Sequence, residues 1–224
     1  MRTPSALRTK SPRTAARRRS SSELEATARE TLMAVALREF ADHGFEGAST
    51  LEIARQAGIT QPMINYHFGS KAGLWEAAFG RVMQEADKLF SDFDTEMKGA
   101  EGRSQLVIAL RRVLLFNTRH PEFGRLMARE GIRPGPRTRW MIRTHLHQHF
   151  EALTQMFERG VEEGWMRPLP VMHVIFFLIG AAAHLAAVPA LAEELYGVDV
   201  KDPTVQREQA DAFVDMMLHG LLKA

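Results

Sequence analysis

One thirteen-residue stretch constrains the fold more than any other; it runs from Ile59 to Lys71 and reads ITQPMINYHFGSK. Thr60 can cap a helix there through its hydroxyl, and Pro62 falls in the first turn, where its missing backbone donor costs nothing. Gly69 ends this helix early, which leaves it too short to be stable alone. Because Gly58 separates it from another helical run, the pattern predicts two helices joined by a tight turn, the helix-turn-helix arrangement.

The expected outer face of the second helix carries no negative charge. It offers amide, phenol and imidazole groups and, at its boundary, an amine: Gln61, Asn65, Tyr66, His67 and Lys71. No acidic residue occurs between Glu52 and Glu76, although the chain is otherwise rich in Asp and Glu. A surface that approaches phosphates is expected to exclude carboxylates, and the second helix of such a unit enters the DNA major groove. The alternative is a connector between two packed helices, because this geometry is common in all-helical proteins.

The net charge of the chain is small but unevenly distributed. All 224 residues together carry +2, whereas residues 1–22 contain seven Arg or Lys and no acid, which leaves 22 basic against 27 acidic residues, or −5, for the remainder. We therefore predict a disordered basic arm over residues 1–21. A solubilising tail is the alternative, and the Ser, Thr and Arg content is also similar to that of an organellar transit peptide.

Composition excludes some kinds of site. The chain contains no cysteine, so disulfides, thiolate metal sites and thiolate nucleophiles are excluded, and a reducing cytoplasm is the expected compartment. A content of 45% hydrophobic and 25% charged residues is ordinary for a globular protein of one or two domains.

Helical periodicity dominates the chain and predicts an all-α fold. The first helix is expected over residues 22–43 and ends at Gly44, and the second begins at Ser49, with Glu52 at the capping-box spacing. With the helix after Thr60 they form a three-helix unit, so we expect an N-terminal domain over residues 22–70 and a C-terminal helical domain over residues 71–224. Its helices are expected at residues 70–97, 104–120, 121–130, 138–163, 171–188 and 203–222, with a loop at residues 131–137.

The run from Thr31 to Phe79 resembles the DNA-binding domain of the TetR family of bacterial transcriptional regulators. The resemblance covers about a fifth of the chain and rests on linked pieces at the expected spacings: Phe40 to Phe45, Ile53-Ala54, Ala57 to Thr60 and Tyr66 to Lys71. One departure is local. Where the family often has a small residue followed by Thr-Leu-Tyr, this chain has Pro62-Met63-Ile64-Asn65, so the operator sequence does not follow from the resemblance.

The resemblance implies a ligand-responsive repressor that binds double-stranded DNA at a palindromic operator as a homodimer and is released by a small-molecule effector in the bacterial cytoplasm. It implies no catalytic residue and no cofactor. The residues expected to contact DNA are Ser49, Thr50, Arg55, Thr60, Gln61, Pro62, Met63, Asn65, Tyr66, His67 and Lys71. We expect the first part of the second helix to contact bases and the later part to contact phosphates.

The C-terminal domain is expected to hold the effector and the dimer contact. Middle helices usually line the effector pocket in proteins that look like this, and the candidates are Phe123, Met127, Trp140, His145, His149, Trp165 and Phe177. Each is equally compatible with an ordinary core position. Residues 171–188 and 204–222 form two apolar helices with more hydrophobic surface than one body needs, which predicts a two-fold dimer through them.

Two features invite other functions. His145, His147 and His149 could serve a metal site or a helical enzyme, but no carboxylate completes a motif such as HExxH. Residues 171–188 approach the lower length limit for a membrane span, and a core or subunit-interface helix is the alternative we favour. We therefore expect no metal and no membrane association.

Overall fold

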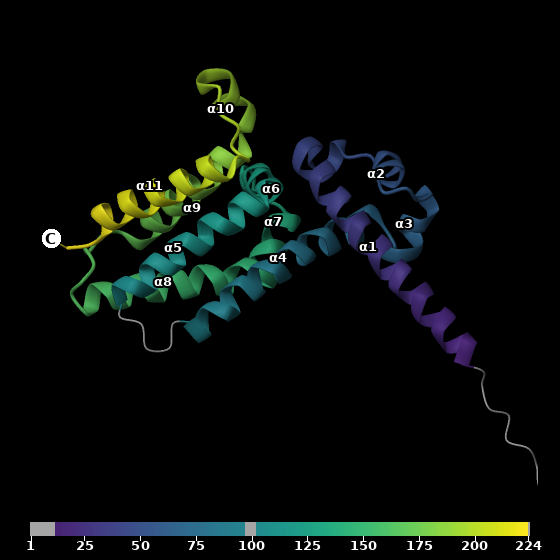
Figure 1. The fold of residues 1–224 in the computed structure, drawn as a ribbon, viewed down its shortest axis with the longest axis horizontal. Coiled ribbons are helices and arrows are strands. Elements are labelled where there is room, and N and C mark those ends of the chain that lie inside the picture. The colour runs from purple at the N-terminus through teal and green to yellow at the C-terminus, as the bar shows by residue number, and fades with distance from the viewer. Residues whose placement is uncertain (1–11, 97–101, 224) are drawn as a thin grey trace, which may run out of the picture.

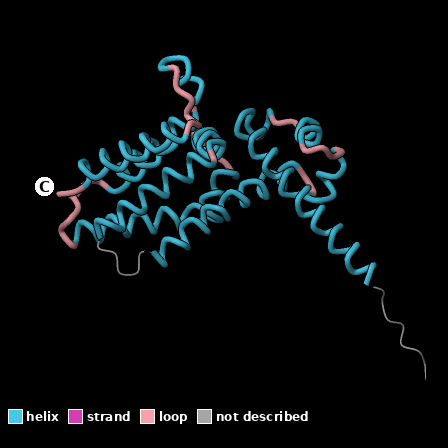
Figure 2. Tube along the Cα trace, viewed as in Figure 1, coloured by secondary structure: helices cyan, strands magenta, loops and turns pink. Residues whose placement is uncertain are grey.

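The computed structural model of the chain describes residues 12–96 and 102–223. Within these ranges the protein forms eleven α-helices, one π-helix and no named strand, which confirms the predicted all-α class (Figure 1 and Figure 2). The first three helices, called the head here, lie at one end of an elongated bundle of the remaining helices, called the body.

The helix bounds follow the predicted ranges with a few exceptions. The head contains α1 (Pro12–Gly47), α2 (Thr50–Gln56) and α3 (Gln61–Phe68). The body contains α4 (Lys71–Glu96), α5 (Gly102–Arg119), α6 (Pro121–Gly131), α7 (Pro136–Met141), the π-helix η1 (Ile142–Leu146), α8 (His147–Glu162), α9 (Val171–Ala187), α10 (Pro189–Tyr196) and α11 (Pro203–Leu221).

The first helix begins earlier than predicted. Residues 12–21 of the predicted disordered arm are helical, and residues 1–11 lie outside the described residues. Ala and Arg are strong helix formers, and the run from Ala15 to Arg19 contains nothing else, which favours the extension. At the other end Gly44 takes a φ of 73°, a left-handed value, so the regular helix breaks where the sequence predicted its end.

The caps of α2 and α3 agree only in part with the predictions. The hydroxyl of Ser49 accepts the N–H of Glu52 at 3.3 Å, as predicted. The reciprocal bond of a capping box is replaced, because the N–H of Ser49 donates instead to the buried carboxylate of Glu39 at 3.2 Å. Thr60 occupies the N-cap of α3 without a side-chain cap bond, so its predicted hydroxyl role is wrong; its carbonyl accepts the N–H of Met63.

One hydrophobic core, called the shared core here, joins the head to the nearer half of the body. Its buried members from the head include Leu37, Phe40, Ile53 and Ile64, and those from the body include Leu74, Trp75, Phe79, Leu126 and Met141. A second core lies among α5, α8, α9 and α11, and it includes Leu106, Leu110, Phe157, Leu178 and Phe213. The 26 residues of α4 span about 39 Å and run from the head along the body, so α4 belongs to both parts.

Two body segments differ from the predicted helices. The range 138–163 is divided into α7, η1 and α8, because π-type bonding interrupts the α-helix at residues 142–146. The short helix α10 was not predicted; Pro189 begins it, and Gly197, with a φ of 66°, ends it. It projects away from the bundle at the end nearer the head (Figure 1).

Candidate DNA-binding surface and effector region

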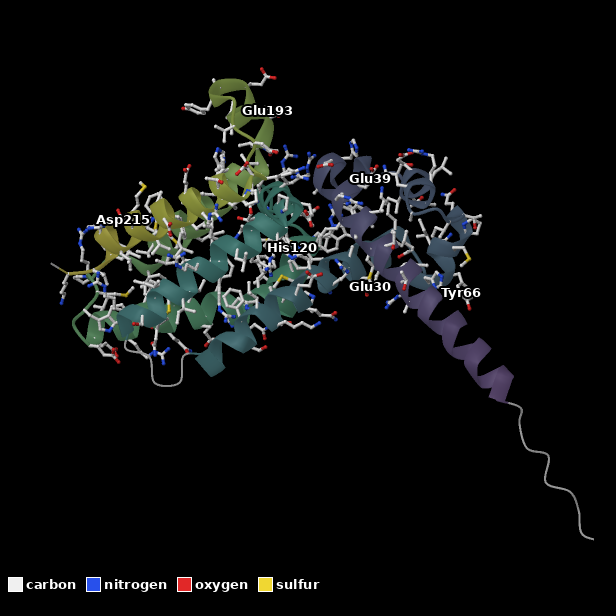
Figure 3. All side chains as sticks on the ribbon, viewed as in Figure 1. Glu30, Glu39, Tyr66, His120, Glu193 and Asp215 are labelled. Atoms are coloured by element: carbon white, nitrogen blue, oxygen red, sulfur yellow. The ribbon has the colours of Figure 1, made fainter. Side chains whose placement is uncertain are left out.

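The helix α3 presents a polar surface at the end of the molecule. Ile64 is 1% exposed and anchors the helix in the shared core. The exposed side chains of the helix are Gln61, Pro62, Met63, Asn65 and Tyr66. Tyr66 is 80% exposed on the side remote from the body (Figure 3), and its ring meets that of His67 edge-on at 5.0 Å. A short helix held by its buried side and otherwise exposed has the shape that enters a DNA groove.

The helix α2 contacts α3 through two residues of the predicted DNA-binding set. Gln61 Nε2 donates to Thr50 Oγ1 at 3.0 Å, which places the starts of the two helices side by side. Since a side-chain amide has two N–H groups and a carbonyl, Gln61 retains the donor and acceptor needed for a bidentate contact with adenine. Ser49 remains exposed at the cap of α2, next to Thr50.

Arg55 is engaged by a carboxylate. Its guanidinium lies 2.6 Å and 2.8 Å from the two carboxylate oxygens of Glu52, and Gln56 also donates to Glu52 at 2.8 Å. The hydrogen bonds from Arg55 and Gln56 lower the pKa of Glu52 to about 2, so the carboxylate is ionised at neutral pH. The positive charge that the sequence places at Arg55 is therefore largely offset in the free protein.

Lys71 is in a different electrostatic state. Its Nζ donates to the backbone carbonyl of Glu46 at 3.2 Å and lies 5.1 Å from the ring centre of Phe45. Neither partner is a carboxylate, so neither offsets the positive charge of Lys71 at the first residue of α4. Among the cations of the predicted set, Lys71 is better suited than Arg55 to meet a phosphate.

The end of α1 is held by α6. Arg125 pairs with the carboxylate of Asp42 at 3.1 Å, and Arg129 donates to the carbonyl of the same residue at 2.9 Å. A further pair joins Glu30 of α1 to Arg81 of α4. These contacts link the head to two helices of the body.

The start of α7 contacts the same part of the head. The guanidinium of Arg137 lies 4.1 Å from the ring centre of Phe45, and it pairs with Glu130 at 3.1 Å and with Glu46 at 3.7 Å. Phe45 therefore meets Lys71 from α4 and Arg137 from α7. A cleft of about 520 Å³ lies between the end of α1 and the α6–α7 segment, and Phe45, Glu130 and Arg137 line part of it. The sequence predicted a loop at residues 131–137 but not this contact, since only the tertiary fold brings Phe45 to Arg137.

Four of the predicted effector residues meet in the shared core. The ring of Trp140 lies 5.9 Å from that of Phe79 and 5.1 Å from that of His145, and Phe123 lies 5.9 Å from Phe79 on another side. Met127 packs against the same core. The structure therefore brings together residues of α6, α7 and η1 around α4, and the rings are in contact with one another.

The other three predicted effector residues lie elsewhere. His149 is next to α4, and its Nε2 lies 2.9 Å from the carboxylate of Asp87. The two groups are close enough for an ion pair, but their orientation does not form a hydrogen bond. Trp165 lies against α5, where its ring approaches Gly102 so closely that a Cβ there would lie 2.5 Å away. Phe177 is 72% exposed on α9. Trp165 thus has a packing position and Phe177 a surface position, apart from the four predicted effector residues that meet around α4.

Burial affects the charge of one histidine in this region, His145. Desolvation lowers the pKa of His145, with the charge of Asp87 opposing the shift and that of His149 adding to it. His145 is therefore neutral near pH 7 and can both donate and accept a hydrogen bond. Throughout residues 12–96 and 102–223, no three His, Asp or Glu side chains are grouped so that they could hold a metal ion.

The last helices expose large apolar side chains. Met172, Phe176 and Phe177 of α9 are 63–72% exposed, and Met216 of α11 is 69% exposed. The helix α10 exposes Leu191, Leu195 and Tyr196. Taken singly, no helix of the described residues is long and apolar enough to cross a membrane; α9 and α10 pass that test of length and composition as a pair, with a bend of 69° between them.

Family models match most of the chain. Residues 32–78 match the bacterial regulatory proteins of the tetR family, and residues 104–217 match the tetracyclin repressor-like C-terminal domain. The chain belongs to the TetR family. The resemblance noted in the sequence is therefore confirmed, and the exposed surface of α3 belongs to a helix-turn-helix DNA-binding unit.

Known transcriptional regulators are similar to this chain along nearly their whole length. The chain is 27% identical over 190 residues to the transcriptional repressor AcnR of Corynebacterium glutamicum, which covers 80% of this chain and 93% of AcnR. The structure of the regulator KstR2 of Mycobacterium tuberculosis superposes with a TM-score of 0.67 at 21% identity, covering 88% and 95% of the two chains. AibR, solved with isovaleryl coenzyme A and operator DNA, superposes with a TM-score of 0.62 at 20% identity, covering 84% and 97%.

The TetR-family assignment fixes the general role of the chain. The family and these neighbours are transcriptional regulators. A DNA-binding head and a helical body are the parts that such a regulator needs.

Proposed function

We propose that this TetR-family regulator is a repressor that binds a palindromic operator as a homodimer in the bacterial cytoplasm and is released by a small-molecule effector. Residues 22–70 would form the DNA-binding domain and residues 71–224 the effector-binding and dimerisation domain, without a cofactor, a metal or a membrane. The observation that carries the proposal is the exposed, acid-free surface of α3. The name of AcnR, a repressor, supports the direction of regulation.

Base recognition is proposed for the first part of α3. Gln61 and Asn65 have amides that pair bidentately with adenine, and Met63 can contact a thymine methyl group. Tyr66, His67 and Lys71 would contact phosphates at the groove wall, as would Ser49, Thr50 and Thr60 at the helix starts. Pro62 would fix the direction in which α3 enters the groove.

The dimer is proposed to form through α9 and α11. A two-fold contact brings the same surface of both copies together, so the exposed side chains of Phe176, Phe177 and Met216 would be buried against their equivalents. Burying large apolar side chains is favourable in proportion to the area removed from water. Two copies of α3 on one side of such a dimer would meet half-sites about one helical turn apart on DNA.

Release is proposed to follow from a population shift. An effector that binds one orientation of the heads more tightly than another lowers DNA affinity by that difference, typically about 1–3 kcal/mol. AibR, which has the same fold, was solved with both isovaleryl coenzyme A and operator DNA, which supports a small-molecule effector for this chain as well. The core around Phe79 is the proposed region, because it touches α4, α6 and α7, the body helices that contact the head.

A direct binding measurement tests the proposed function. The full chain should bind a fragment from upstream of its own gene at least about a thousandfold more tightly than random DNA of equal length, as specific regulators do. Fluorescence anisotropy at a fixed salt concentration measures both affinities. A genome-wide map of bound DNA would locate other operators if that fragment is not one. Equal affinity for every genomic fragment would contradict the proposal.

A further inference from the structure

Trp75 contains a buried hydrogen-bond donor without an acceptor. The residue is 2% exposed on α4, and its indole Nε1 finds no hydrogen-bond partner in the described part of the chain. Most buried donors in proteins are satisfied, so each exception requires an explanation, and a functional role is one such explanation. The N–H of Trp75 is therefore a group that a bound molecule could satisfy.

The surroundings of this donor are aromatic. The ring of Trp75 stacks on Phe79 with centres 5.6 Å apart and planes 12° apart, and Trp140 meets it edge-on at 5.5 Å. His145 adds a fourth ring, 5.5 Å from Phe79. No side chain with a formal charge belongs to this set of four, since burial keeps His145 neutral near pH 7. Flat, uncharged surfaces with a few polar atoms are typical of small-molecule sites.

One wall of this cluster can move more easily than the other. Trp75 and Phe79 belong to the regular helix α4, whereas Trp140 and His145 belong to the short helix α7 and the π-helix η1. Segments of π-helix are rare in proteins, and those that occur are often found at functional sites. Trp140 is only partly buried, so its ring can leave the cluster while the rest of the shared core stays folded.

We propose that the effector is an uncharged planar heteroaromatic molecule that displaces Trp140 from the rings of Trp75 and Phe79 and accepts a hydrogen bond from Trp75 Nε1. Planarity follows from the ring faces that bound the site, and the acceptor follows from the unpaired donor. A hydrocarbon of the same shape fills the same space but leaves the N–H unsatisfied. The inference rests on the proposed effector-dependent function and names the chemical class of its ligand.

The position of Trp140 connects this site to the head. It lies three residues after Arg137 in the same six-residue helix, and Arg137 contacts Phe45 and Glu46 of the head. A ligand that moves Trp140 therefore moves the helix whose other end touches the head. The effector would therefore bind with different affinity to the two positions of the head. Such a difference in affinity is what release from DNA requires.

Quinoline and naphthalene are suitable probes, because both are planar two-ring molecules of nearly the same shape and only quinoline has a ring nitrogen that accepts a hydrogen bond. Equilibrium dialysis against the full chain, without DNA, should show roughly tenfold tighter binding of quinoline, as expected for one net hydrogen bond. Trp75→Phe keeps an aromatic ring and removes the N–H, so the preference for quinoline should be lost or reversed, because its ring nitrogen would then be buried without a donor.

Trp165→Phe is the matched control. Trp165 packs against the second core, and its Nε1 already donates to Glu163 at 2.8 Å. This change should therefore leave the quinoline preference intact. Trp140→Ala provides a second variant that leaves the donor in place: both probes should bind several-fold more tightly with their ratio unchanged. Several outcomes would overturn the proposal. In the unaltered protein these are absence of binding and a quinoline-to-naphthalene affinity ratio near one. In the variants they are a quinoline preference that survives Trp75→Phe, a preference that is lost in Trp165→Phe, and weaker binding of the probes after Trp140→Ala. DNA plays no part in the dialysis, so its outcome is separate from the test of operator binding.

Discussion

Replacing Lys71 by alanine should reduce the salt dependence of DNA binding far more than replacing Arg55 by alanine. Both residues are cations that the sequence places at the DNA, Arg55 in α2 of the head and Lys71 at the start of α4. The Nζ of Lys71 contacts a neutral carbonyl and an aromatic ring, whereas the guanidinium of Arg55 contacts the ionised carboxylate of Glu52 at 2.6 Å. A phosphate can use the charge of Lys71 directly, but it must compete with a carboxylate for Arg55.

The expected size of the difference follows from counterion release. Each phosphate neutralised by a cation contributes about −0.9 to the slope of log affinity against log salt concentration. A dimer has two copies of Lys71, so Lys71→Ala should make the slope shallower by about 1.8. Between about 50 and 200 mM salt, the variant would then lose about twelvefold less affinity than the unaltered protein. Arg55→Ala should change the slope by much less than one unit, because its charge is already offset.

Fluorescence anisotropy with one labelled operator, at several potassium chloride concentrations, measures these slopes. Glu52→Gln is the informative third variant, since it removes the carboxylate that offsets Arg55. The cap of α2 should survive this change, because Ser49 accepts the backbone N–H of residue 52 and not its side chain. The slope should become steeper in Glu52→Gln, and Arg55→Ala should reverse that gain.

Two results would refute this reasoning. Equal slopes in Lys71→Ala and Arg55→Ala would mean that the pairing of Arg55 with Glu52 does not survive contact with DNA. A slope that does not change in Lys71→Ala would mean that no phosphate replaces the carbonyl of Glu46, and Lys71 would then be a residue of the head's internal packing.

Three further changes test other parts of the molecule. Asn65→Ala should cost about 1–3 kcal/mol at particular base pairs, measured across single-base operator variants; an equal loss on every variant would argue against base contact. Phe177→Glu should give folded monomers, measured by sedimentation, that bind DNA weakly in titrations. Ala182→Glu, at a position 0% exposed, should instead destabilise the protomer itself. An intact dimer of Phe177→Glu would exclude the proposed interface. Arg137→Ala should lower the free energy of unfolding by about 1–2 kcal/mol, since it removes a cation–ring contact and ion pairs, while Arg139→Ala at an exposed position of the same helix should change it by less than about 0.5; equal losses in urea denaturation would count against the contact with the head.

The local features of the head could be predicted from the sequence because they depend on neighbouring residues. Gly44 and Gly69 both have positive φ values at the ends of helical runs, and Ser49 forms the expected cap. The outward position of Asn65 agrees with the predicted polar face, whereas the inward position of Ile64 was not predicted. These signals act over a few residues, so one sequence is enough to recognise them.

The features that the sequence did not predict depend on contacts between distant segments. Helix α9 is apolar on all sides, so its pattern alone could not distinguish the buried Ala182 from the exposed Phe177. Trp165 was grouped with the effector residues because it is aromatic, although its neighbour is Gly102, which lies far from it in the sequence. The contact of Arg137 with Phe45 is of the same kind, since a loop sequence does not reveal its partner in another part of the fold.

The core that joins the head to the body determines how this protein can be divided and recombined. Leu74, Trp75 and Phe79 follow the predicted domain boundary at residue 70, yet they belong to the same core as Phe40 of the head. A fragment cut after residue 70 would lose that apolar cover, and a foreign head joined there would meet partners that it does not fit. A working chimera would therefore need its junction beyond Ala86, the last buried residue that α4 contributes to this core. New operator specificity is more easily reached by exchanging the outward residues of α3, which can change while the packing behind them stays the same.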